Sequence, residues 1–168
     1  MKTPSGSGRQ RPGRAGLSRG EIALLVVAGL AFLHHVDHVL RGDNSGWPFT
    51  PDVTAFTVSL LIYPIFVADF LLLRPRPRLR AGIASFLFVA LLAVHTLIET
   101  PAMQYGTWAA GRSSVPGAVG NPNLFSVASP ALGALSVAVS ALLSIAVLVA
   151  VWLLAREASS TAKGVGDG

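Results

Sequence analysis

The sequence predicts an all-α protein, a four-helix transmembrane bundle, from its low charge, its apolar runs and the placement of its basic residues. Of the 168 residues, 52% are hydrophobic and only 12% are charged, whereas a soluble domain carries about a quarter charged residues. The mean hydropathy is +0.60. The chain is too short to hold both such a membrane part and a sizeable soluble enzyme, so we expect a multi-pass protein of the cell membrane.

Four apolar stretches approach the roughly 20 residues that a helix needs to cross hydrocarbon. These expected spans are 21–40, 53–73, 81–99 and 131–155. The strictly apolar part of the first, 22–33, is too short alone, so the histidine-rich stretch after it must complete the crossing. Pro64 removes a backbone donor in the second span and predicts a kink. Serines every four residues in the fourth span, at Ser136, Ser140 and Ser144, predict close helix packing.

The basic residues favour one orientation. Lys and Arg number five in residues 1–20, four in the turn 74–80 and two in 156–168, whereas the other two loops hold only Arg41 and Arg112. By the positive-inside rule both termini are cytoplasmic, and the inner face contacts anionic lipid headgroups. Residues 1–20 lack the apolar surface to order themselves and are expected to be a disordered cytoplasmic tail.

Other features exclude some classes of protein. The first apolar run is not followed by a small-x-small cleavage site, so it is expected to be a retained span and not a signal peptide. The absence of cysteine excludes disulfides, thiolate metal sites and iron–sulfur clusters. Basic clusters without interleaved aromatic residues argue against nucleic-acid binding.

The segment 100–130 has no clear periodicity and is expected to be either functional or poorly ordered. Aromatic anchors at the membrane interfaces are expected at Trp47, Tyr105, Trp108 and Trp152.

The polar residues within the spans point to a site near the outer leaflet. The first and third spans run in the same direction, and at 1.5 Å per residue His34 and His95 lie roughly 20 and 21 Å from the inner ends of their helices. His38 and Glu99 each follow one turn later. The two helices therefore offer two rungs at matched depth, His34 with His95 and His38 with Glu99.

Three imidazoles and a carboxylate are a suitable ligand set for zinc, copper or iron. Asp37 is either a further ligand or the group that orients a histidine through its second ring nitrogen. The alternative is that these groups only bond to one another, with Asp37 and Arg41 as an ion pair four residues apart. His35 points about 100° away and is expected to be structural or solvent-facing, and Asp69 is expected to pair with Arg74 or Arg76. The predicted metal ligands are His34, His38, His95, Glu99 and Asp37.

Three functions fit this pattern, and the sequence leaves open whether the protein is an enzyme. The first is a metal-binding membrane protein, in one version a hydrolytic enzyme using a metal-bound water. The second is a non-enzymatic subunit for transport, sensing or assembly, with a membrane partner or as a homo-oligomer, in which the histidines serve as a proton or pH element. The third is a b-type haem protein with His34 and His95 as axial ligands.

Overall fold

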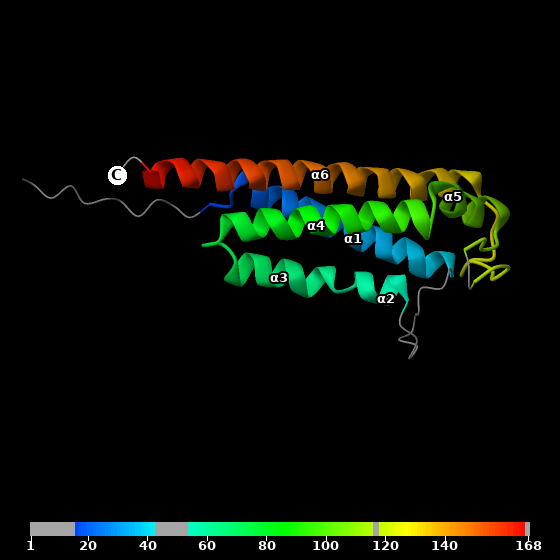
Figure 1. Cartoon of the computed structure of the whole chain (residues 1–168). Coiled ribbons are helices and arrows are strands. Elements are labelled where there is room, and N and C mark those ends of the chain that lie inside the picture. The colour runs from blue at the N-terminus through cyan, green and yellow to red at the C-terminus, as the bar shows by residue number, and fades with distance from the viewer. Residues whose placement is uncertain (1–15, 43–53, 116–117, 167–168) are drawn as a thin grey trace, which may run out of the picture.

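The computed structural model describes residues 16–42, 54–115 and 118–166, and in these ranges the regular structure is helical. The helices are α1 (Arg19–Arg41), α2 (Ala55–Ser59), α3 (Ile62–Leu72), α4 (Pro77–Leu97), α5 (Pro101–Ala110) and α6 (Pro130–Gly166). Figure 1 shows α1, α3, α4 and α6 side by side, with α5 across one end of the bundle. Most of the predicted N-terminal tail, and the loop that carries Trp47, lie outside the described residues.

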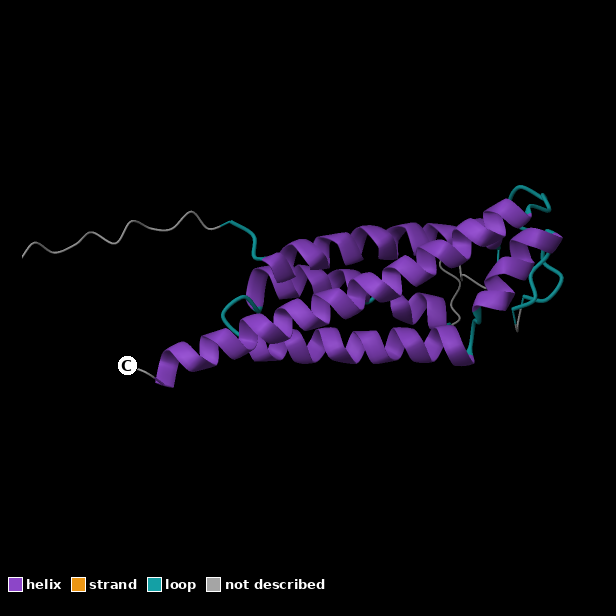
Figure 2. Ribbon diagram, turned by 90° about the horizontal axis from the view of Figure 1, so that it is seen from above, coloured by secondary structure: helices purple, strands orange, loops and turns teal. Residues whose placement is uncertain are grey.

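Three helices are long and apolar enough to cross a membrane, namely Arg19–Arg41, Pro77–Leu97 and Pro130–Thr161. The structure thus confirms three of the four predicted spans as candidate membrane helices. The helix α6 continues past the predicted end of the fourth span at residue 155. Figure 2 shows its C-terminal part running beyond the ends of the neighbouring helices.

The second predicted span is broken into α2 and α3. Pro64 has no amide hydrogen to donate to the carbonyl of Leu60. That carbonyl accepts instead from the Tyr63 amide at 3.2 Å, and the helix is interrupted at Leu60–Leu61. The predicted kink is therefore present as a break one turn before the proline, and neither piece alone has the length of a membrane span.

The helix α1 is defined at both ends by its sequence. Ser18 and Glu21 form a reciprocal capping box, in which the Glu21 amide donates to Ser18 Oγ and the Ser18 amide donates to the Glu21 carboxylate. At the other end Gly42 adopts a left-handed conformation with φ 63°. A Cβ there would lie 2.9 Å from the carbonyl oxygen of Pro122, so this terminus requires glycine.

The segment 100–130 is structured where it is described. Thr100 caps α5, and Gly111 ends it in a left-handed conformation. Trp108 is buried within the protein, so its indole is not exposed to lipid headgroups as an interfacial anchor would be. The chain after α5 returns over the end of α1, where the Leu124 amide donates to the Leu40 carbonyl at 2.9 Å. Of the two expectations for this segment, poor ordering is wrong for its described part.

Ion pairs join three helices at the end of the bundle where α1 begins. The Arg80 guanidinium donates to both oxygens of Asp69, at 2.7 and 3.0 Å. Arg74 likewise donates to both oxygens of Glu21, at 2.6 and 2.9 Å, and this raises the pKa of Arg74. The predicted pairing of Asp69 with Arg74 or Arg76 is wrong, because α4 begins at Pro77 and its first turn directs Arg80 toward α3. We call Glu21, Asp69, Arg74 and Arg80 the arginine cluster.

An apolar layer separates the arginine cluster from the histidines. On α1 it contains Leu24 and Val27, which fall between Glu21 and His34. It encloses a cavity of about 40 Å³ between α1, α3, α4 and α6. The residues around that cavity include Leu24, Val27, Phe66, Leu91, Leu143 and Val147.

Candidate functional site

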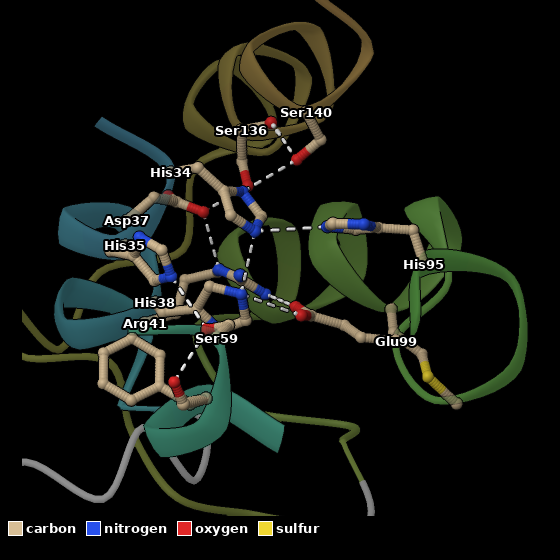
Figure 3. A network of polar contacts seen from close by, with 12 residues as sticks. His34, His35, Asp37, His38, Arg41, Ser59, His95, Glu99, Ser136 and Ser140 are labelled. Atoms are coloured by element: carbon tan, nitrogen blue, oxygen red, sulfur yellow. Dashed lines mark hydrogen bonds and ion pairs between the residues drawn. The ribbon is translucent and has the colours of Figure 1, made fainter. Parts of the chain in front are cut away.

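The predicted site residues come together where the C-terminal half of α1 meets α4, α5 and α6 (Figure 3). We call them the histidine cluster. Among them His34, Arg41 and Glu99 are buried, the others are partly buried, and most of their polar atoms face one another. The cluster comprises His34, Asp37, His38 and Arg41 from α1, His95 from α4, and Glu99, which follows α4.

Both predicted rungs are present. The Nε2 atoms of His34 and His95 lie 3.1 Å apart, and Nε2 of His38 lies 3.1 Å from Oε2 of Glu99. A third contact joins the rungs, since Nε2 of His34 also lies 3.1 Å from Nε2 of His38. Three imidazole nitrogens and one carboxylate oxygen thus form a continuous chain of contacts.

The second ring nitrogens of His34 and His95 are held by groups outside this chain of contacts. Nδ1 of His95 lies 2.9 Å from the Leu91 carbonyl oxygen. A carbonyl only accepts, so Nδ1 of His95 carries a hydrogen. Nδ1 of His34 lies 3.1 Å from Oγ of Ser140. In both rings the Nδ1 contact therefore fixes the orientation of the imidazole, and Nε2 is directed into the cluster.

Asp37 and Arg41 form the ion pair that the sequence offered as the alternative to a site. Nε of Arg41 donates to Asp37 Oδ2 at 2.7 Å, and Nη1 of Arg41 donates to Oε1 of Glu99. Asp37 also accepts from Trp108 Nε1 at 2.9 Å and from Ser136 Oγ at 2.6 Å. These contacts tie α1 to α5 and α6, and they lend no support to Asp37 as a metal ligand.

Trp108, Ser136 and Ser140 are the partners that sequence reasoning missed. The sequence assigns the serines to helix packing and Trp108 to the membrane interface. The spacing of Ser136 and Ser140 does match one face of α1, where Asp37 and His34 lie one turn apart. No sequence signal indicates that the two faces meet, because that depends on the rotation of α6 about its axis.

His35 is expected from the sequence to be either structural or solvent-facing, and the structure shows that it is buried and has a structural role. Its Nε2 and Nδ1 atoms each make a 2.8 Å contact, with Ser59 Oγ and Tyr63 Oη respectively. Ser59 lies at the end of α2 and Tyr63 at the start of α3. His35 therefore binds both sides of the helix break and points away from the histidine cluster.

Among the residues that the structure describes, no three His, Cys, Asp or Glu side chains stand in an arrangement ready to hold a metal ion. In the histidine cluster the donor atoms touch one another. The charges of its members are also unbalanced, since Asp37 and Glu99 carry two negative charges against the one positive charge of Arg41 when the imidazoles are neutral. The arginine cluster, by contrast, pairs two carboxylates with two guanidinium groups.

Compared with known proteins, the chain matches no family model, no curated protein and no solved structure. Its function therefore has to be inferred from the geometry of its own residues.

Proposed function

We propose that this chain is a multi-pass membrane protein that binds one divalent transition-metal ion at the histidine cluster. The ligands would be Nε2 of His34, His38 and His95, with Glu99 as the carboxylate. The observation that carries the proposal is the meeting of three Nε2 atoms, each 3.1 Å from the next, with a carboxylate oxygen at the end of the row. Zinc, copper and iron all accept such a ligand set.

The hydrogen bonding of His95 supports a cation in this place. Because Nδ1 of His95 donates to Leu91, the neutral ring presents a bare lone pair on Nε2 toward His34. Metal-binding histidines have this arrangement, with the second nitrogen donating to a carbonyl or carboxylate. The unbalanced negative charge of the cluster also favours a cation.

The distances between successive donor atoms along the row are close to those of a filled site. Metal–nitrogen bonds of about 2.0–2.1 Å in a tetrahedron place neighbouring donor atoms about 3.3 Å apart. The contacts of His34 with His38 and His95, at 3.1 Å each, are a few tenths of an ångström shorter than that, and a filled site would also require the two ends of the row to approach each other. An axial haem would need about 4 Å between two nitrogens, twice a metal–nitrogen bond, with a porphyrin between the rings. A bare ion thus fits better than a haem.

A shared proton is the second candidate. One proton between His34 and His95 would bring the charge of the cluster to zero without moving any side chain. The lack of a ready three-ligand arrangement among the described residues favours this reading. It corresponds to a sensing or assembly subunit in which the histidines act as a pH element.

We further propose four spans with both termini cytoplasmic. In this topology α2 and α3 together form the second of the four crossings, and His35 contacts residues on both sides of the break between them. The 11 Lys and Arg residues of the tails and the turn 74–80 then lie inside, and the exposed Arg74, Arg76 and Arg78 contact anionic headgroups. The histidine cluster then lies near the outer leaflet. The apolar layer between the two clusters separates it from the cytoplasmic side.

Metal content of the purified protein tests the proposal. The full chain, extracted in detergent and exposed to zinc, copper or iron before desalting, is expected to retain about one ion per chain. His95→Ala removes a ligand and should abolish retention, whereas Tyr63→Phe, which alters only the contact to His35, should not. No ion on the folded wild-type protein would favour the shared proton, and an ion that survives His95→Ala would show that the ligand set is wrong.

A further inference from the structure

We infer that Ser140 is a positioning residue that sets the tautomer of His34, and so decides whether this ring presents a lone pair or a hydrogen to the histidine cluster. The inference deepens the proposed function and rests on it for the effect on metal binding. The effect on the tautomer is independent of any metal. It concerns a residue that the sequence assigned only to helix packing.

The Ser140 hydroxyl has two neighbours to which it could donate, and we place its hydrogen on the Ser136 carbonyl, where a Ser hydroxyl in a helix commonly donates. Ser140 Oγ lies 3.1 Å from His34 Nδ1 and 3.3 Å from the Ser136 carbonyl oxygen. The hydroxyl has one hydrogen, and the carbonyl has none to give. With that hydrogen on the Ser136 carbonyl, Oγ accepts, and the hydrogen between Ser140 and His34 belongs to Nδ1 of the imidazole.

This direction determines the state of the other ring nitrogen of His34. A neutral imidazole with its hydrogen on Nδ1 has a bare lone pair on Nε2. That atom of His34 faces Nε2 of both His38 and His95. When the His95 ring is neutral its Nε2 is also bare, so two lone pairs point at each other across 3.1 Å, and this favours a metal ion or, in its absence, a shared proton between them.

Removal of the Ser140 hydroxyl would reverse the tautomer. Both residues are buried, with 5% of His34 and 7% of Ser140 exposed, so water has little access to replace Oγ. A buried N–H without an acceptor is unfavourable. The hydrogen would then move to Nε2 of His34 and bond to the lone pair of His95. The cation site would become a neutral hydrogen bond between two histidines.

The neighbouring serines do not share this role. Ser136 Oγ donates to Asp37, and Ser144 Oγ donates to the Ser140 carbonyl, at 3.0 Å. Ser144→Ala is therefore a matched control on the same stripe of α6. Ser140→Thr keeps the hydroxyl and should restore what Ser140→Ala loses.

The test is nitrogen-15 NMR of histidine-labelled full-length protein in detergent, stripped of metal by a chelator, with the His34 signals assigned by their loss in His34→Gln. Wild-type protein, Ser144→Ala and Ser140→Thr are expected to carry the hydrogen on Nδ1 of His34, and Ser140→Ala on Nε2. The inference is overturned if wild-type His34 is protonated on Nε2, or if Ser140→Ala leaves the tautomer unchanged.

Metal affinity gives the second readout. Ser140→Ala should weaken binding of zinc by about 10- to 100-fold, the usual cost of losing an outer-shell partner, while Ser140→Thr and Ser144→Ala stay near the wild-type value. Unchanged zinc affinity in Ser140→Ala would overturn the positioning role. If the wild type binds no metal, the proposed metal site fails, but the tautomer result still decides whether Ser140 controls His34.

Discussion

The Nε2 atoms of His34 and His95 lie 3.1 Å apart, although the residues are 61 positions apart in the chain. They meet because α1 and α4 run in the same direction and place the two residues at the same depth (Figure 1). Glu99 lies just past the end of α4, four residues after His95, and its Oε2 lies 3.1 Å from Nε2 of His38. The contacts of the histidine cluster thus follow from helix geometry that the sequence already contains.

Trp108 is expected to stabilise the fold through its hydrogen bond to Asp37. Trp108→Phe keeps most of the ring but leaves Asp37 Oδ1 without its 2.9 Å donor in a largely buried setting. We expect a loss of about 1–3 kcal/mol in the free energy of unfolding, measured by thermal unfolding in detergent. Trp152→Phe, at a residue that is 54% exposed, should cost much less. Equal effects of the two substitutions would show that the hydrogen bond from Trp108 to Asp37 does not stabilise the fold.

Asp69 is expected to be essential for the arginine cluster. Asp69→Asn removes the carboxylate that binds the buried guanidinium of Arg80 through two hydrogen bonds. The carboxylate that remains nearest to Arg80 is that of Glu21, at the longer distance of 3.5 Å. Removing one partner of a buried ion pair costs about 3 kcal/mol or more. Arg76→Gln, at an exposed side chain on the same turn, should change stability by less than about 0.5 kcal/mol. Denaturation of both variants in the same detergent measures the difference, and a stable Asp69→Asn protein would mean that Arg80 is not held as described.

Gly133 is expected to tolerate no side chain. A Cβ at this position would lie 2.7 Å from the Tyr105 carbonyl oxygen, so α5 would have to move away from α6. Gly133→Ala should therefore destabilise the protein by about 1–3 kcal/mol. Gly29→Ala is the matched control, since nothing lies within 4 Å of a Cβ there and alanine favours the helix. If Gly133→Ala is as stable as Gly29→Ala, α5 does not pack on α6 at this point.

The apolar layer predicts binding without transport. The side chains around the cavity of about 40 Å³ between the two clusters are apolar, and they would not hydrate a metal ion or a proton. Proteoliposomes with a metal-sensitive dye inside should therefore show no uptake above protein-free vesicles, with an ionophore as the positive control. Saturable uptake that His95→Ala abolishes would show that the protein is a transporter and that the layer opens.

The sequence predicted those parts of the site that depend on residue positions within a single helix. Depth along α1 and α4 follows from the residue count, and the Asp37–Arg41 pair follows from the four-residue spacing. The partners on α5 and α6 could not be predicted, because they depend on how those helices are rotated and on the fold of the segment around Trp108.

The same limit explains the errors in the fold. Pro64 signalled an irregular helix, but the position of the break depends on which carbonyl loses its donor and how the turn before it tightens. The partner of Asp69 depended on the residue at which α4 begins. That start lies at Pro77, inside the segment that the sequence assigned to a basic turn.

X-ray absorption at the edge of the bound metal tests the central claim most directly, because it counts ligands by type. For the zinc-loaded full-length protein we predict about four donors near 2.0–2.1 Å, three of them imidazole nitrogens, and no bound zinc in His95→Ala. A shell of water oxygens, or a wild-type protein that retains no zinc, would contradict a metal centre built from His34, His38, His95 and Glu99.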